Sequence, residues 1–214
     1  MKRIQETFSD AQKSLQHIVG KIDNVDKCNA IDIFARKGDW ISHIIYPKVN
    51  SFEAWEINPN YIESLQTNLP NAQVHCRDSI KFIKENTDYK KFDIVFIDNG
   101  LNCYGKNREY CEHFDVLPHI DNISSNNCFV IINVVTKPFS YDDYPDWKIR
   151  RNEFYGVSDS SELSLAFLEV FYEDYFSELG YDVLETHTNC REYKDGVDYN
   201  YHFGFKLVKR ENNG

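Results

Sequence analysis

Acidic side chains recur directly after short apolar segments of this sequence. They are Asp32, Glu56, Asp78 and Asp98, and Glu56 follows Asp32 by 24 positions. An acid about 20 residues after a strand-to-helix loop is typical of sites where a carboxylate accepts hydrogen bonds from both hydroxyl groups of a ribose. The spacing therefore indicates chemistry on a nucleoside without a 2′-phosphate, held at one edge of a sheet.

The apolar segments have the length and composition of buried β-strands. Strands are predicted over residues 29–35, 51–57, 72–76, 92–97 and 128–135, with a final pair over 181–188 and 199–208. Helical segments separate the first five strands, an alternation typical of a parallel sheet covered by helices on both faces. The short link across Asp195-Gly196 indicates that the last pair is antiparallel.

Helical spacing of apolar residues places helices before and between the strands. They are predicted over residues 8–22, 38–46, 58–68, 78–83, 107–117 and 160–179. Asn58-Pro59 is a typical start, with asparagine as N-cap and proline at the first helical position. Residues 136–159 contain prolines and polar groups and are expected to form a long loop, a feature often associated with function.

The order of five β-α units and an antiparallel ending resembles class I S-adenosylmethionine-dependent methyltransferases, over roughly residues 28–209. The segment Asp32-Ile33-Phe34-Ala35-Arg36-Lys37-Gly38 resembles the D-L-F-A-G-x-G loop of several RNA methyltransferases, with Arg36 in place of a glycine. The resemblance implies a Rossmann-like α/β fold: a seven-stranded, mostly parallel sheet with an antiparallel last strand. It also implies S-adenosylmethionine as cofactor, bound by Asp32, Phe34, Ala35, Gly38, Glu56, Ile57, Asp78 and Ser79.

The candidate catalytic residues are Asp98, Asn99 and Asn133, because in this family the end of the fourth strand faces the methyl group. Val95-Phe96-Ile97-Asp98 resembles the V-F-I-D-A segment of catechol-type O-methyltransferases, and no proline follows as in the N-P-P-Y type. Those O-methyltransferases use an Asp-Asn pair for a metal. Here Ile132-Asn133 lacks the carboxylate, and no metal is expected. Methyl transfer depends mainly on positioning, so Asp98 is expected to orient the acceptor or take its proton.

The candidate substrate-binding residues mix aromatic, amide and basic groups: Asn102, Tyr104, Tyr144, Trp147 and Arg150. Aromatic and basic side chains together favour stacking of a base and neutralisation of phosphate, hence an RNA or nucleotide-containing acceptor. The net charge of −10 and the V-F-I-D segment instead favour a small molecule.

Two other functions remain open. Arg36 in the glycine loop favours a binding or scaffold protein that kept the fold without catalysis. A nicotinamide-dependent Rossmann enzyme is less consistent with the antiparallel ending and the lack of a full G-x-G-x-x-G. We expect an N-terminal helical segment over residues 1–27 and a methyltransferase domain over 28–214. No membrane partner is expected, since no apolar run approaches the ~20 residues of a span. The cytosol is the expected location, with the six cysteines as free thiols.

Overall fold

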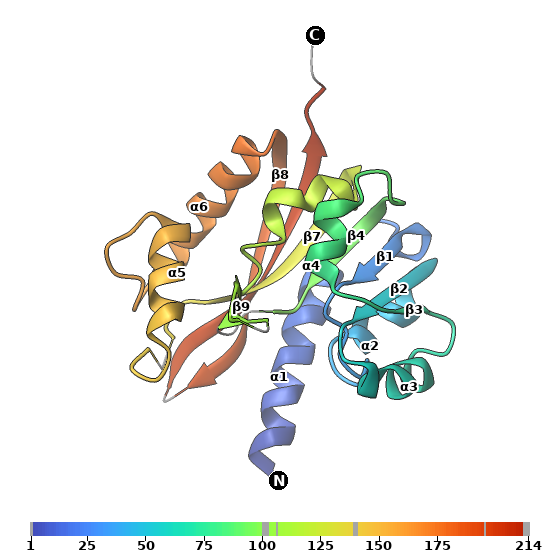
Figure 1. The fold of residues 1–214 in the computed structure, drawn as a ribbon, viewed down its shortest axis with the longest axis horizontal. Helices are drawn as coiled ribbons and strands as arrows, with labels where there is room; N and C mark the ends of the chain where they lie inside the picture. Colours follow the sequence, from blue (N-terminus) through green and yellow to red (C-terminus); the bar gives the residue numbers. More distant parts are fainter. Residues whose placement is uncertain (1, 100–102, 106, 139–140, 195, 212–214) are drawn as a thin grey trace.

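A computed structural model describes residues 2–99, 103–105, 107–138, 141–194 and 196–211, and its centre is one seven-stranded sheet (Figure 1). The strand order is β3-β2-β1-β4-β7-β9-β8. The strands are β1 (Asn29–Asp32), β2 (Ser51–Glu56), β3 (Gln73–Cys76), β4 (Phe92–Ile97), β7 (Ser124–Val135), β8 (Tyr181–Lys194) and β9 (Val197–Lys209). β3, β2, β1, β4 and β7 pair in parallel, whereas β9 is antiparallel to β7 and to β8. The expected sheet, with its antiparallel last strand, is confirmed.

The strand order reverses between β1 and β4, which are neighbours in the sheet although β2 and β3 lie between them in the chain. The loops after β1 and β4 therefore leave the same edge in opposite directions. In open α/β sheets this reversal opens a crevice beyond the carboxyl ends of the strands, where ligands bind. The fold thus places the residues after Asp32 and Ile97 at one binding crevice.

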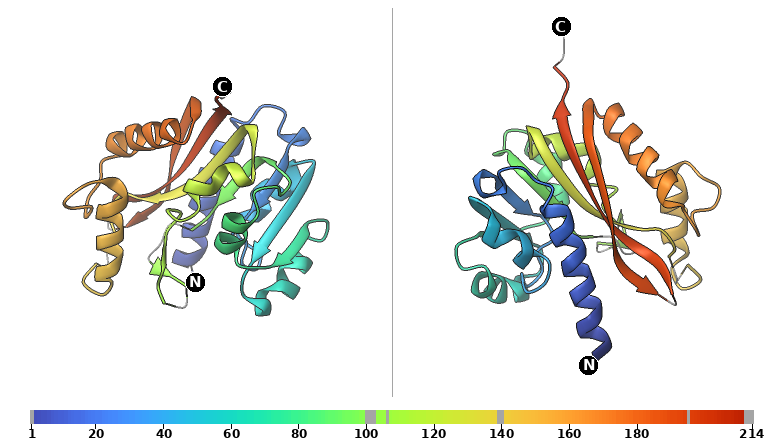
Figure 2. Two further views of the ribbon diagram at one scale, coloured as in Figure 1. Left: turned by 45° about the horizontal axis from the view of Figure 1, so that its top comes forward. Right: turned by 180° about the vertical axis from the view of Figure 1, so that it is seen from behind.

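Helices cover both faces of the sheet (Figure 2). On one face lie α1 (Lys2–Val19), α2 (Ser42–Ile45) and α3 (Pro59–Asn68); on the other lie α4 (Ser79–Glu85), α5 (Pro145–Tyr155) and α6 (Leu165–Glu178). The described residues also form three 3-10 helices, η1 (Val25–Lys27), η2 (Tyr46–Lys48) and η3 (Leu117–Asn122). Two separate clusters of buried apolar side chains fill the two interfaces.

Helix α1 is part of the first of these cores. Ala11, Leu15 and Ile18 are fully buried and pack in the cluster that contains Phe129 of β7. At Gly204 of β9 an added Cβ would lie 2.5 Å from Ile18 Cγ2, so only glycine allows α1 to approach this closely. The division of the chain at residue 27 stays a prediction. No helix within the described residues is long and apolar enough to cross a membrane.

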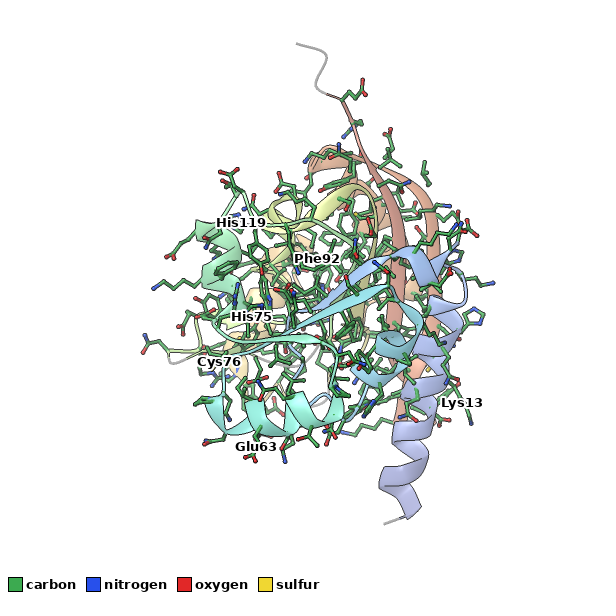
Figure 3. The ribbon with its side chains drawn as sticks, turned by 90° about the vertical axis from the view of Figure 1, so that its right-hand side faces the viewer. Lys13, Glu63, His75, Cys76, Phe92 and His119 are labelled. Carbon is green, nitrogen blue, oxygen red and sulfur yellow. The ribbon has the colours of Figure 1, made fainter. Side chains whose placement is uncertain are left out.

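Strand β3 forms one edge of the sheet, and Figure 3 shows this edge facing the viewer, with His75 and Cys76. His75 Nε2 lies 3.3 Å from Glu53 Oε1 of β2, which also accepts hydrogen bonds from Trp55 Nε1 and Tyr89 Oη, each at 2.6 Å. These contacts engage one oxygen of a carboxylate that is 1% exposed, and Lys90 Nζ pairs with the other, so the cluster stabilises the sheet edge.

Three expected elements differ. The helix predicted over 107–117 is wrong: the small antiparallel sheet of β5 (Cys103–Tyr104) and β6 (Tyr110–Cys111) lies there, followed by turns. Arg108 and Glu112 have φ values of 57° and 45°, which a right-handed helix excludes. The loop predicted over 136–159 is also wrong in its middle, where α5 begins with Pro145 and ends before Gly156, at φ 65°. The predicted helix 38–46 shortens to the single turn α2.

Candidate active site

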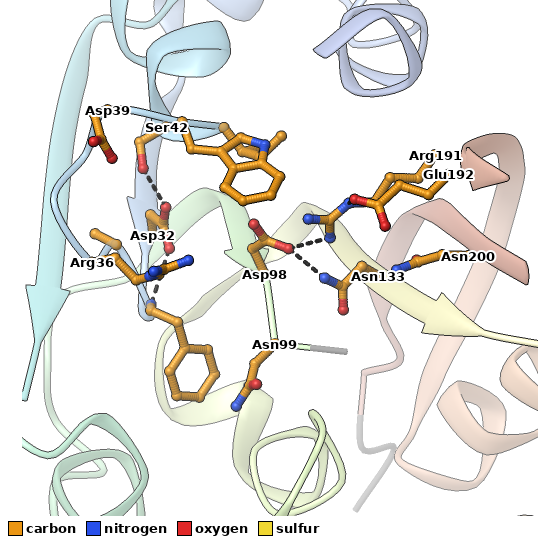
Figure 4. A pocket seen from close by; sticks show the side chains of 14 residues that line it. Asp32, Arg36, Asp39, Ser42, Asp98, Asn99, Asn133, Arg191, Glu192 and Asn200 are labelled. Atoms are coloured by element: carbon orange, nitrogen blue, oxygen red, sulfur yellow. Dashed lines mark hydrogen bonds and ion pairs between the residues drawn. The ribbon is translucent and has the colours of Figure 1, made fainter. Parts of the chain in front are cut away.

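Two pockets open at the carboxyl edge of the parallel strands. The central pocket, of about 370 Å³, is lined by Asp32, Phe34, Ala35, Arg36, Asp39, Trp40, Ile41, Ser42, Asp98, Asn99, Asn133, Arg191, Glu192 and Asn200 (Figure 4). The β2–β3 pocket, of about 440 Å³, is lined by Ile33, Phe34, Glu56, Ile57, Asp78, Ser79, Ile80, Tyr104, Gly105, Glu109 and Tyr110. Phe34 lines both pockets and so lies between them.

Asp32, the last residue of β1, shapes the loop that follows it. Its Oδ1 accepts a hydrogen bond from the Phe34 backbone N–H at 3.0 Å, and its Oδ2 accepts one from Ser42 Oγ at 2.6 Å. The side chain is 2% exposed, and this burial, with a smaller contribution from the charge of Asp98, raises the pKa of Asp32 to about 7. Asp32 therefore anchors the loop from within the pocket wall.

Arg36 takes the backbone conformation that glycine would take at its position. Its φ is 50°, in the left-handed region, and its N–H donates to Glu56 Oε2 at 2.9 Å. The side chain is exposed and lines the central pocket, and it is not among the residues that line the β2–β3 pocket. Arg36 therefore preserves the loop and leaves the neighbourhood of Glu56 open.

Gly38 supports the same loop from outside the pockets. Its φ is 66°, and an added Cβ would lie 2.6 Å from Leu65 Cδ1 and 3.0 Å from Leu69 of the α3 region. Glycine is needed here because the loop approaches α3 closely with positive φ. Gly38 thus allows the loop to pack against α3, whereas Phe34 and Ala35 line the central pocket.

The β2–β3 pocket brings together the acids that follow the second and third strands. Glu56 is 7% exposed, and its Oε1 accepts from the Asn58 N–H at 2.6 Å. Asp78 is the N-cap of α4, since its Oδ1 accepts from the Lys81 N–H at 3.1 Å. Ser79 Oγ donates to the Ile33 carbonyl at 2.5 Å, and Ile57 is 63% exposed at the pocket wall. Carboxylates and apolar side chains thus face one space.

Asp98 lines the central pocket, and one oxygen of its carboxylate accepts two hydrogen bonds. Its Oδ1 accepts from Asn133 Nδ2 and from Arg191 Nη1, the latter at 2.5 Å. Its Oδ2 accepts nothing from the described residues. The Arg191 guanidinium also lies 5.4 Å from the Trp40 ring centre, a cation–π contact. Asp98 is therefore held as one half of an ion pair, with its second oxygen available.

Arg191, Glu192 and Asn200 are pocket residues that the sequence analysis missed. They lie on β8 and β9, where the long antiparallel pair extends beyond the predicted 188 and 199 to Lys194 and Val197. These residues lie far from Asp98 along the chain, so no local sequence pattern indicates that they share a pocket with it.

The aromatic and basic residues proposed for substrate lie mostly away from the central pocket. Trp147 is 2% exposed and donates to Glu112 Oε1 at 2.6 Å. Arg150 donates to the Glu109 carbonyl at 2.8 Å and to Asp115 at 3.0 Å. Tyr144, 37% exposed, lies beside Arg108, and Tyr104 lines the β2–β3 pocket. Asn102 lies outside the described residues. Asn99 lines the central pocket.

Within the described residues, no group of three or more histidine, cysteine, aspartate or glutamate side chains is arranged to hold a metal ion.

The strand order, with the reversed β9 between β7 and β8, is that of the class I S-adenosylmethionine-dependent methyltransferase fold. Trm5b from Pyrococcus abyssi is similar, with a TM-score of 0.58 and 14% identity over 94% of this chain and 48% of that chain. This chain therefore spans about half the length of Trm5b. The sequence matches no protein-family model and no curated protein.

Two further solved structures are similar over most of their own length. One is a putative RNA methyltransferase from Pyrococcus horikoshii, with a TM-score of 0.55 and 16% identity over 94% of this chain and 84% of that chain. The other is the plantazolicin methyltransferase BamL with SAH, with a TM-score of 0.55 and 14% identity over 96% and 85%. At these identities the similarity establishes the fold.

Proposed function

We propose that this chain is an enzyme that transfers a methyl group from S-adenosylmethionine to an acceptor in the central pocket. The observation that carries the proposal is the β2–β3 pocket, where Glu56 and Asp78, from two neighbouring strand ends, line one space of about 440 Å³. Among the described residues, Phe34 alone is shared with the pocket that holds Asp98. A nucleoside and a reacting centre therefore fit side by side.

The β2–β3 pocket suits adenosine. Each carboxylate oxygen of Glu56 accepts one backbone N–H, which fixes its position and leaves lone pairs for a ribose hydroxyl pair. Asp78 Oδ1 binds Lys81 N–H, and the carboxylate is placed to accept from an adenine amino group. Ile33, Ile57 and Ile80 supply apolar contact for the base. In this proposal the methionine part of the cofactor extends past Phe34 towards Asp32.

We expect the central pocket to act by positioning the methyl acceptor, without forming a covalent bond to it. Transfer from a sulfonium is an in-line displacement, so its rate depends on holding the acceptor atom close to the methyl carbon. Asp98 is oriented by Arg191 and Asn133, and its Oδ2 is available to an acceptor. We assign Asp98 to orienting the acceptor and receiving its proton, with Arg191 as a positioning residue and Asn99 on the same wall.

The charge of the pocket favours a compact acceptor without phosphate. The lining contains four acids, Asp32, Asp39, Asp98 and Glu192, against two arginines. The basic residues of α5 are engaged within the protein: Lys148 pairs with Asp159 at 3.0 Å, and Arg150, the basic candidate for substrate binding, pairs with Asp115. Arg151 is fully buried with Glu112. An RNA or nucleotide acceptor remains the alternative, and it requires its phosphates to stay outside this pocket.

Isothermal titration with S-adenosylhomocysteine tests the cofactor. We expect binding to the wild type and a loss of about tenfold or more in Glu56→Ala, since a charged hydrogen-bond acceptor is worth roughly 1.5–3 kcal/mol. Glu63→Ala removes an exposed acid from α3 and is the matched control, expected to bind as the wild type. No detectable heat from folded wild type at millimolar ligand would reject the proposal and favour a scaffold protein.

The cytosol is the location we propose for this enzyme. None of the six cysteines forms a disulfide in the structure, among them the buried Cys111 and Cys128. Unpaired thiols are typical of a reducing compartment.

A further inference from the structure

Two buried side-chain oxygens beside the central pocket have no hydrogen-bond partner. Asn133 of β7 is 3% exposed and Asn200 of β9 is 1% exposed. Neither Oδ1 receives a hydrogen bond from the described residues. A buried acceptor without a donor is costly to folding, so such groups usually serve a ligand, an ion or a water molecule.

The two asparagines form one surface. β7 pairs with β9 so that Asn133 lies opposite His202 and Val135 lies opposite Asn200. Directly opposed residues of an antiparallel pair share a face, and successive alternate residues lie on that same face. Asn133 and Asn200 are therefore diagonal neighbours, and both line the central pocket (Figure 4).

The contacts of Asn133 determine the orientation of its side-chain amide, and hence which amide atom lacks a hydrogen-bond partner. Its Nδ2 donates to Asp98 Oδ1, and an ionised carboxylate only accepts hydrogen bonds. Rotating the amide would place two acceptor oxygens against each other. The Oδ1 of Asn133 is therefore the unpaired atom, directed away from Asp98 (Figure 4).

No described residue of the lining donates a hydrogen bond to these oxygens. The guanidinium of Arg191 is engaged by Asp98 at 2.5 Å and by Glu192 at 3.7 Å, and Arg36 is exposed. Around the two amides lie further acceptors, Asp98 Oδ2 and the Glu192 carboxylate. The unpaired oxygens on this wall thus lack donors, and a ligand complementary to them must supply several N–H or O–H groups.

We propose that the central pocket takes a nitrogen nucleophile, an amino or amidino group whose N–H bonds reach Asn133 Oδ1 and Asn200 Oδ1. A hydroxyl acceptor has one hydrogen to donate, whereas an amino group has two and matches both oxygens. This inference rests on the proposed function and names the class of its methyl acceptor.

The transfer balances with groups already in the pocket. The nitrogen lone pair forms the new N–C bond as the C–S bond breaks, and the sulfur keeps that electron pair. The methylated nitrogen then carries a positive charge and an extra proton. Asp98 Oδ2, which has no partner among the described residues, receives this proton and passes it to solvent.

A cofactor analogue with an amine at the reacting position probes these oxygens directly. In sinefungin the sulfur of S-adenosylhomocysteine is replaced by a carbon that bears an ammonium group, placed where the methyl group would face the acceptor. We would measure both ligands by calorimetry against wild type, Asn200→Ala and Asn200→Asp. Asn60→Ala, which removes an exposed carboxamide from α3, is the matched control.

We expect the amine analogue to bind wild type and Asn60→Ala at least tenfold more tightly than S-adenosylhomocysteine. Asn200→Ala should lose most of this preference, and Asn200→Asp should keep it because the acceptor is retained. Equal affinities of both ligands for the wild type, or an unchanged preference in Asn200→Ala, would overturn the inference while the cofactor proposal stands. Equal weakening of both ligands in Asn200→Ala would also overturn it, by assigning Asn200 to the methionine part. Binding of neither ligand would reject the proposed function itself.

Discussion

Arg191, near the end of β8, binds Asp98 of the β4 end through an Nη1–Oδ1 contact of 2.5 Å, although 93 positions separate them in the chain. Their side chains are 7% and 17% exposed. The contact joins the antiparallel half of the sheet to the parallel half at the binding crevice. It also fixes the carboxylate that we assign to the acceptor.

Arg191→Ala should lower the free energy of unfolding by about 2–4 kcal/mol, since it leaves Asp98 with a largely buried charge and no cation. Arg191→Lys should recover part of this loss, because a lysine keeps the charge and loses the planar stacking on Trp40. Urea unfolding measures both. Arg36→Ala, an exposed arginine of the same pocket, is the control and should stay within about 0.5 kcal/mol of the wild type. Equal stability of Arg191→Ala and the wild type would show that the ion pair contributes nothing.

Arg36→Gly tests the left-handed loop. Because Arg36 has a φ of 50°, glycine relieves strain there, and we expect stability to rise by up to about 1 kcal/mol with S-adenosylhomocysteine binding retained. Urea midpoints and calorimetry measure the two effects. Cofactor binding that appears only in Arg36→Gly would mean that the natural arginine blocks the site, and would support a scaffold function.

Asp32 should make stability fall as the pH rises. Burial raises its pKa in the folded protein to about 7 from an ordinary value of 3.8, so the folded state binds more protons than the unfolded state between these values. The stability that this group contributes is therefore fully present below about pH 4 and is lost as the pH rises to about 7. Above that pH the group causes no further change in stability. Asp32→Asn removes this titration and keeps an acceptor for the Phe34 N–H. In urea unfolding, the free energy of unfolding of Asp32→Asn minus that of the wild type should increase by roughly 2–4 kcal/mol from pH 4 to pH 8. A difference that does not change with pH would contradict the assignment.

The buried pair of Arg151 and Glu112 should anchor α5. Both side chains are fully buried 2.7 Å apart, and Arg151 also donates to the Val135 carbonyl at 2.7 Å. Arg151→Ala should cost about 3–5 kcal/mol of unfolding free energy, because it leaves a buried carboxylate without its cation. Lys148→Ala, on the same helix as Arg151, breaks an exposed pair with Asp159 beyond the helix end and should cost less than about 1 kcal/mol. Similar losses in the two variants would show that burial does not set the strength of these pairs.

Gly204→Ala should loosen the contact between α1 and β9. The added Cβ would lie 2.5 Å from Ile18 Cγ2 and 2.6 Å from Phe129 Cε1, so we expect a loss of about 1–3 kcal/mol. In an Ile18→Ala background the same substitution should cost clearly less, since the clashing methyl group is absent. Thermal or urea unfolding of the four proteins measures this coupling. Additive effects would indicate that α1 does not pack against Gly204 in solution.

The strands and the acids that follow them could be predicted because the signals are local. Phe92–Ile97 is apolar except for Asp93, and Asp98 follows the strand directly, so strand and pocket position come from adjacent residues. The same holds for Glu56 after β2 and for Asp78 at the start of α4. Parallel pairing then brings such carboxyl ends to one edge, whatever the loops between them.

The rest depended on contacts between distant segments. Residues 107–117 have helical spacing, yet Glu112 leaves helical geometry to reach the buried guanidinium of Arg151, and this contact outweighs a weak local preference. Trp147 carries no local sign that Glu112 holds its indole N–H in the core. Arg191 and Asn200 reach the pocket only because the β8–β9 pair extends past the sheet edge. Pairing across a hairpin depends on both strands together, which no single stretch of chain encodes.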